Sequence, residues 1–154
     1  MSGKSKRRPF PDVPRRKDPP RRLPPSDLPG SDNSGERLCW RFSHVDHDGP
    51  WSFGAMGGEE LCALMKRLAQ LETMTVGEAF PGNGYPGKDY NTEEIPTAEA
   101  RDRLDAIGLA DMTKISVFRL GGEQRLYGFR CGNVFHVVWW DPGHVIWPSR
   151  KKHT

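Results

Sequence analysis

Residues 114–140 read KISVFRLGGEQRLYGFRCGNVFHVVWW, and this stretch decides the fold. It contains three runs rich in β-branched and aromatic residues, which are typical of strands: Lys114–Leu120, Arg125–Arg130 and Val134–Trp140. Gly121-Gly122 and Gly132-Asn133 separate the runs, and both pairs are typical of tight hairpin turns. The stretch therefore predicts an antiparallel meander of three strands.

Upstream of the meander, the pattern predicts one strand and two helices. The strand covers Leu38–Val45, and the second helix runs from Thr97, after a proline, to Gly108. Between them, apolar residues recur at helical spacing from Gly58 to about Met74. This first helix is expected to bury one stripe: Leu61, Leu64, Met65, Leu68 and Leu71. The Gly- and Pro-rich segment Pro81–Ile95 is predicted to be a loop. The expected fold is α+β, in the order β-α-α-β-β-β, with the meander packed on two helices.

The N-terminal residues differ in composition from the rest of the chain. Residues 1–30 hold eight of the fourteen prolines and nine Lys/Arg against three Asp/Glu. This composition predicts a disordered basic tail over 1–36, followed by one domain over 37–154. The tail either holds nucleic acid electrostatically or is a solvated linker. Residues 31–112 are acidic and residues 113–154 basic, a segregation that favours a polyanionic partner.

Composition also excludes several classes of protein. The sequence has no apolar run of the length that a membrane-spanning helix needs, and no apolar region follows the basic N-terminus as in a secretory signal. The three cysteines are too scattered for a disulfide scaffold or a zinc cluster. We therefore expect a cytoplasmic protein without a cofactor.

Two short motifs suggest ligands but lack the required context. Gly82–Lys88 fits the start of a P-loop, yet Asp89 follows where Ser or Thr must reach the metal. His44–Gly49 contains metal-ligand residue types, and His136 or His144 would have to complete a site at no defined spacing. The sequence favours a loop in the first case and a polar surface turn in the second, with no metal.

Cationic side chains gather in the C-terminal third of the chain. They are Lys114, Arg119, Arg125, Arg130, Arg150, Lys151 and Lys152. Such a set binds phosphates and stabilises a charged transition state without a metal, while His136, His144 or Tyr127 moves the proton of an RNA 2′-hydroxyl. The alternative is a solvated sheet face with His136 in the core. Arg125 is the central candidate, because period-2 alternation places Tyr127 and Phe129 on its face.

From Leu38 to Thr154 the chain resembles the RelE/ParE toxin superfamily. The most specific resemblance lies in Lys114-Ile115-Ser116-Val117, the Gly-rich turn and Arg125-Leu126-Tyr127. It implies the toxin of a toxin–antitoxin pair, a metal-independent endoribonuclease that cleaves messenger RNA during translation. Its partners would be an antitoxin protein and ribosome-associated RNA. A ParE-type inhibitor of DNA gyrase without chemistry is the alternative, as is an inactive relative that binds nucleic acid or protein.

Within this resemblance, Arg125 matches the central arginine of the family's second C-terminal strand. Lys114 matches a lysine of the preceding strand, and Arg150, Lys151 and Lys152 fall where the family keeps late basic residues. The long segment Pro81–Ile95, the basic tail and the sequence Trp139–His144 depart from the family pattern. The antitoxin is expected to neutralise the basic C-terminal surface.

Overall fold

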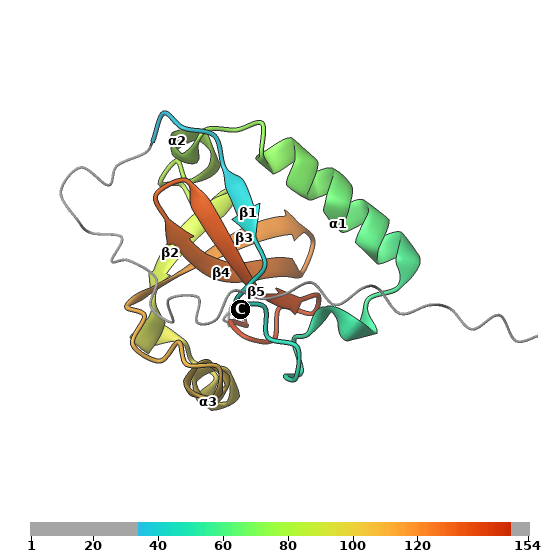
Figure 1. Ribbon diagram of the computed structural model, residues 1–154, viewed down its shortest axis with the longest axis vertical. Helices are drawn as coiled ribbons and strands as arrows, with labels where there is room; N and C mark the ends of the chain where they lie inside the picture. Colours follow the sequence, from blue (N-terminus) through green and yellow to red (C-terminus); the bar gives the residue numbers. More distant parts are fainter. Residues whose placement is uncertain (1–33, 149–154) are drawn as a thin grey trace, which may run out of the picture.

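The structure, a computed structural model, describes residues 34–148 and contains a five-stranded mixed sheet covered by helices (Figure 1). The strands are β1 (Cys39–Arg41), β2 (Gly87–Asn91), β3 (Lys114–Gly121), β4 (Gln124–Cys131) and β5 (Val134–Asp141). The helices are α1 (Gly58–Leu71), α2 (Val76–Ala79) and α3 (Ala98–Ala106), with 3-10 turns at Phe53–Ala55 and Thr92–Glu94. The expected α+β class is confirmed. Within the described range, no helix is both long and apolar enough to cross a bilayer.

Strands β3, β4 and β5 form the antiparallel meander that the sequence predicts. The sheet order is β1-β5-β4-β3-β2, so the meander occupies its centre. Gly121, Gly122 and Gly132 adopt positive φ values of 124°, 53° and 58° at the two turns. Glycine reaches these angles without the steric cost that a side chain imposes, which explains why both hairpins turn at glycine.

The prediction of a loop over Pro81–Ile95 is wrong at its centre. Here β2 pairs antiparallel with β3, from Gly87 opposite Phe118 to Asn91 opposite Lys114. A Cβ atom at position 87 would lie 2.6 Å from a ring carbon of Phe80, so glycine is needed where β2 passes this ring. With the short helix α2 added as well, the element order becomes β-α-α-β-α-β-β-β, not β-α-α-β-β-β.

The first strand is shorter than predicted and makes the sheet mixed. Only Cys39–Arg41 of the expected Leu38–Val45 is extended, and it pairs in parallel with β5. Beyond it the irregular chain makes two backbone hydrogen bonds to β5: Asp46 N donates to the carbonyl oxygen of Val138 at 3.1 Å, and Trp140 N donates to that of Trp51 at 2.9 Å. The parallel edge strand therefore ends where this irregular connection begins.

Each face of the sheet has its own hydrophobic core. One contains Leu104 of α3 with Tyr127 and Trp139, and the other contains Leu68 of α1 with Leu126. Since neighbouring residues 126 and 127 point to opposite faces, α1 and α3 cover opposite sides of the sheet. Figure 1 shows the two helices on different sides.

The two main helices follow the sequence pattern with one correction. In α1, Leu64, Leu68 and Leu71 are buried, but Leu61 and Met65 are 49% and 55% exposed, so the predicted stripe is too wide. At 100° per residue, the buried residues Leu64, Leu68 and Leu71 lie within an arc of about 60° on the side of the helix that faces the sheet. Leu61 and Met65 lie about 60° and 100° from Leu64, outside this arc. At the end of α3, Gly108 has a φ of 78°, which confirms the predicted left-handed C-terminal glycine.

Candidate functional site

A small cavity of about 40 Å³ opens on the sheet face that carries α3. Arg119 of β3 and Arg125 of β4 stand directly opposite each other at this cavity. The other residues that line it are Gly84, Lys88, Tyr90, Val117, Tyr127, His144 and Trp147. The structure thus brings together four residues predicted from sequence: Arg119, Arg125, Tyr127 and His144. We call this cavity the basic pocket.

The basic pocket concentrates positive charge. Lys88, Arg119 and Arg125 line it, and none of its lining residues is acidic. Burial and the neighbouring Arg119 lower the pKa of the Arg125 guanidinium. Like charges directly opposite on paired strands destabilise a sheet, and a bound anion removes that repulsion. The pocket is therefore suited to an anion. At about 40 Å³ it is far below the roughly 300 to 1,000 Å³ of a small-molecule site, and it suits one phosphate group.

Arg125 is held in place by the hairpin from which it emerges. Its Nη1 donates hydrogen bonds to the carbonyl oxygens of Gly122 at 2.7 Å and Gln124 at 3.0 Å. One edge of the guanidinium is therefore anchored. A guanidinium carries five N–H donors in a fixed plane, so the remaining donors are preorganised for a ligand.

His144 is placed by a turn that Asp141 organises. Both oxygens of the buried Asp141 accept backbone hydrogen bonds, from Val145 N at 3.0 Å and Ile146 N at 2.8 Å. His144 adopts a φ of 56°, a left-handed conformation that costs energy in a residue other than glycine. Burial and the charge of Arg125 lower the pKa of His144 below 6.5, so its imidazole is neutral at pH 7. A neutral imidazole beside a phosphate site can accept a proton.

Tyr127 differs from His144 in its chemistry. Its side chain is buried in the core beneath the pocket, and burial followed by the charge of Asp141 raises its pKa above the ordinary value. The phenol therefore stays protonated at neutral pH. It can donate a hydrogen bond, but it is not a base.

The structure does not bring the other predicted site residues into the basic pocket. His136 lies opposite Phe129, five residues before Asp141 on β5, which corresponds to about 16 Å along the strand. Arg130 binds Asp89 at 2.9 Å and lies 4.9 Å from the ring centre of Phe80, on the α1 side of the sheet. Lys114 lines a neighbouring cavity. The predicted residues Arg150, Lys151 and Lys152 lie outside the described residues, as does most of the predicted tail.

His136 instead is buried and packs against the half-buried His44 beside β1. The ring centres are 5.3 Å apart, and Nδ1 of His136 is buried without a hydrogen-bond partner. Burial, then the charges of His44 and Arg41, lower the pKa of His136 to about 4. A buried, neutral His136 agrees with the alternative prediction that this histidine belongs to the core.

We expect His136 to make the stability of the fold depend on pH. Because the pKa of His136 is about 4 in the folded chain and 6.5 when unperturbed, the unfolded state binds more protons between these values. The contribution of neutral His136 to the free energy of unfolding is complete above pH 6.5 and is lost as the pH falls towards 4. We expect this contribution to reach about 1 to 3 kcal/mol. Urea unfolding of the wild type and His136→Gln at about pH 7 and pH 4.5 measures it. A smaller fall in stability is expected for the variant, and equal falls would contradict the assignment.

Sequence reasoning missed Lys88, Tyr90 and Trp147, which complete the basic pocket. Lys88 is the lysine of the P-loop-like motif, but it lies within the strand β2, where a P-loop would continue into a helix. Its position in the pocket depends on the pairing of β2 with β3, which the local sequence did not indicate. Thr97 holds the segment before Trp147, since its Oγ1 donates to the carbonyl oxygen of Ile146 at 2.6 Å.

The turn at His44–Gly49 exposes His47 and Asp48, as the sequence favoured, but it buries Asp46. Asp46 is 1% exposed, and its carboxylate accepts hydrogen bonds from Arg103 and from Nε1 of Trp139. Among residues 34–148, no three His, Cys, Asp or Glu side chains are grouped so as to hold a metal. The hydrogen bonds of Asp46 thus connect its own turn to α3, through Arg103, and to β5, through Trp139.

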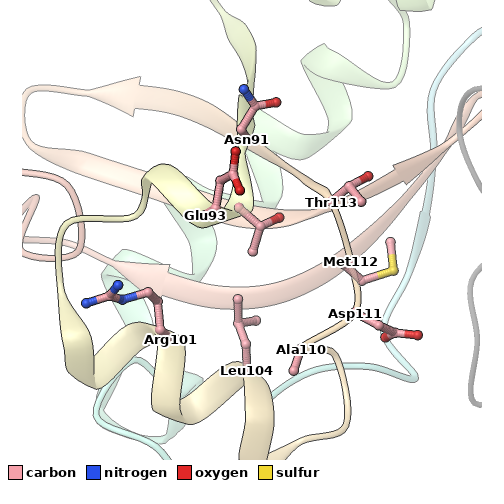
Figure 2. A pocket seen from close by; sticks show the side chains of 9 residues that line it. Asn91, Glu93, Arg101, Leu104, Ala110, Asp111, Met112 and Thr113 are labelled. Carbon is pink, nitrogen blue, oxygen red and sulfur yellow. The ribbon is translucent and has the colours of Figure 1, made fainter.

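A wider cavity of about 500 Å³ lies between α3 and the segment before β3 (Figure 2). Leu104 points towards it, whereas Arg101 and Asp111 extend outward on opposite sides. The hydroxyl of Thr92, which also lines it, is buried without a hydrogen-bond partner. Because its charged side chains diverge, this cavity is a weaker candidate for catalysis than the basic pocket.

Comparison with known proteins finds no family model, no curated protein and no solved structure that matches this chain. The geometry and charge of the basic pocket are therefore the features that indicate its function.

Proposed function

We propose that the chain is the toxin of a toxin–antitoxin pair and that it cleaves messenger RNA during translation without a metal. One observation carries the proposal: Arg119, Arg125, Tyr127 and His144, selected from sequence as phosphate-binding or proton-transferring residues, line one cavity. The α+β class with an antiparallel meander, which the RelE/ParE resemblance implies, supports the proposal at the level of fold class. The strand β2 and the helix α2 are additions to that pattern.

The cationic side chains act on the scissile phosphate. Arg125, fixed by its hairpin, and Arg119 opposite it bind two of the phosphate oxygens, while Lys88 approaches from β2. Negative charge grows on these oxygens as the phosphorus becomes five-coordinate. Preorganised donors stabilise that charge more strongly than the charge of the ground state, and this difference lowers the barrier.

His144 is the general base of the proposed reaction. It takes the proton of the ribose 2′-hydroxyl, and the 2′-oxygen forms a bond to phosphorus. The bond from phosphorus to the 5′-oxygen breaks, and the leaving oxygen takes a proton from water. The products are a 2′,3′-cyclic phosphate and a 5′-hydroxyl. Tyr127, which keeps its proton, donates a hydrogen bond at the reacting phosphate.

The proposed antitoxin neutralises this same surface. Its acidic segment replaces the RNA phosphate at Arg119 and Arg125, because both ligands present anionic oxygens to the same donors. Binding of the antitoxin and of RNA would therefore be mutually exclusive.

The structure of the cleavage products tests the proposed chemistry. Translated messenger incubated with the purified full-length chain is expected to yield fragments with 5′-hydroxyl ends and 2′,3′-cyclic phosphates. A matched messenger with one 2′-deoxynucleotide on the 5′ side of the cut is expected to stay intact there, because the attacking oxygen is missing. Fragments with 5′-phosphates would contradict the mechanism. Growth arrest with intact messenger and trapped gyrase complexes would favour the gyrase inhibitor instead.

A further inference from the structure

A second cavity of about 380 Å³ adjoins the basic pocket. Both cavities are lined by Lys88, Tyr90 and Trp147, so these three side chains stand at their junction. The other residues of the second cavity are Asp89, Asn91, Glu94 and Lys114. We call it the β2-edge cavity, because most of its lining comes from β2 and the turn that follows.

The two cavities differ in size in a way that suits the two halves of a nucleotide. The basic pocket, at about 40 Å³, accommodates one phosphate group. The β2-edge cavity, at about 380 Å³, lies within the usual range of roughly 300 to 1,000 Å³ for sites that bind a small organic molecule. Of these two cavities, only the β2-edge cavity has room for the ribose and base attached to a phosphate in the basic pocket.

An aromatic pair provides a stacking surface at the junction. The rings of Tyr90 and Trp147 are 4.4 Å apart between centres and inclined by 35°. The ammonium of Lys88 lies 4.8 Å from the ring centre of Tyr90. Stacking on aromatic side chains is the usual way in which proteins hold unpaired bases of single-stranded RNA.

The polar lining of the β2-edge cavity presents one carboxylate to a base. Asp89 is already engaged, since its two oxygens accept hydrogen bonds from Ser116 at 2.5 Å and Arg130 at 2.9 Å. Glu94 is exposed, and its Oε1 accepts a long hydrogen bond of 3.4 Å from Nδ2 of Asn91, which orients the carboxylate. Lys114 adds a positive charge to the same lining.

Guanine is the base that matches these groups. Its Watson–Crick edge carries two adjacent N–H donors, at N1 and N2, which a carboxylate accepts together, and an O6 acceptor suited to an ammonium. Adenine presents an acceptor at N1, where guanine presents a donor. Adenine therefore leaves the carboxylate facing a lone pair.

We propose that the β2-edge cavity binds a guanine base of the RNA, with Glu94 as the residue that determines specificity. The inference rests on the proposed function, because the phosphate of the same nucleotide occupies the basic pocket. Guanine stacks on the Tyr90–Trp147 pair, Glu94 accepts from N1 and N2, and Lys114 donates to O6. The strand β2 thus gives the enzyme a preference for the nucleotide next to the cut.

Calorimetric binding of nucleoside 3′,5′-bisphosphates to the full-length chain tests this inference. These probes carry a phosphate on each side of the ribose, so they fit either polarity of the bound strand. The guanosine compound is expected to bind at least about ten-fold more tightly than the adenosine compound, since base-edge contacts of this kind discriminate by factors of this order. In Glu94→Gln the preference should fall below about three-fold, while the affinity for inorganic phosphate is unchanged. The matched control Glu93→Gln, one residue earlier and outside the β2-edge cavity, should keep the preference.

The results that would contradict the guanine site differ from those that would contradict the proposed function. Equal affinities for the two bisphosphates, or a preference for guanosine that survives Glu94→Gln, would overturn the guanine site. The phosphate site would still be supported in that case if Arg125→Ala abolishes the binding of inorganic phosphate. A preference for another base would overturn the assignment of guanine. Failure of both bisphosphates and inorganic phosphate to bind would overturn the two proposals together.

Discussion

Replacing Arg125 with alanine is expected to lower the rate of messenger cleavage by about 100- to 1000-fold, the usual cost of removing one preorganised donor from an anionic transition state. The guanidinium is anchored to the carbonyl oxygens of Gly122 and Gln124 and lines the basic pocket, so the side chain is fixed before the phosphate arrives. Single-turnover cleavage of translated messenger gives the rate. Growth arrest on expression should weaken in parallel.

The same substitution should have a small effect on stability. It removes two hydrogen bonds of the β3–β4 hairpin, worth about 1 kcal/mol each, but also relieves the repulsion between Arg119 and Arg125. Thermal unfolding should therefore shift by only a few degrees. A large loss of stability would make Arg125 a structural residue and leave the loss of activity unexplained by chemistry.

Two matched variants sharpen this prediction. Arg125→Lys keeps the charge but cannot hold the hairpin and the phosphate with one planar group, so it should recover only part of the lost rate. Lys66→Ala removes one positive charge from an exposed position on α1, which covers the opposite face of the sheet, and should leave the rate unchanged. Equal losses in Arg125→Ala and Lys66→Ala would show that overall charge, not the basic pocket, governs the activity.

The features that could be predicted from sequence are those fixed by local rules. Alternation along β4 places Arg125 and Tyr127 on one face, and the glycine pairs mark both hairpins, so the centre of the sheet and half of the basic pocket follow from neighbouring residues. His144 could be nominated as a residue type, but its place in the pocket depends on the hydrogen bonds from Val145 and Ile146 to Asp141.

The features that could not be predicted depend on pairing between distant segments. Lys88 and Tyr90 lie in a polar strand bounded by glycine and proline, and only its hydrogen bonds to β3 make it extended. His136 carries the right chemistry for a catalytic base, yet its position along β5 separates it from Arg125. Asp46 reads as a surface residue, because the partners that bury it come from α3 and β5.

Asp46 should therefore be the residue whose loss destabilises the fold most among the charged side chains discussed. Burial alone would raise the pKa of its carboxyl group, but hydrogen bonds from Arg103 and Trp139 outweigh that effect and hold the pKa below 3.8. Oδ1 accepts from Nη2 of Arg103 at 2.6 Å, and Oδ2 accepts from Nε of Arg103 and Nε1 of Trp139, both at 3.0 Å. The backbone N–H groups of Asp48 and Gly49 also donate to Oδ1, each at 3.2 Å.

Asp46→Ala is expected to reduce the free energy of unfolding by about 3 to 5 kcal/mol at pH 7, because it leaves a buried indole N–H and two backbone N–H groups without their acceptor. Asp48→Ala is the matched control: this aspartate is exposed, and its loss should cost less than about 0.5 kcal/mol. Urea unfolding of both variants and the wild type measures the difference. Similar stabilities for Asp46→Ala and Asp48→Ala would contradict the assignment.

The dependence on pH and a double substitution identify the cause of this loss. Since the folded pKa of Asp46 is lowered, its stabilisation is complete above the unperturbed value of 3.8 and is lost as the pH falls through the folded value. The gap between the wild type and Asp46→Ala should therefore narrow below about pH 4. Trp139→Phe removes the indole donor, so Asp46→Ala should cost about 1 to 3 kcal/mol less in that background. An unchanged cost there would mean that Arg103 and the backbone donors, not the core tryptophan, account for the role of Asp46.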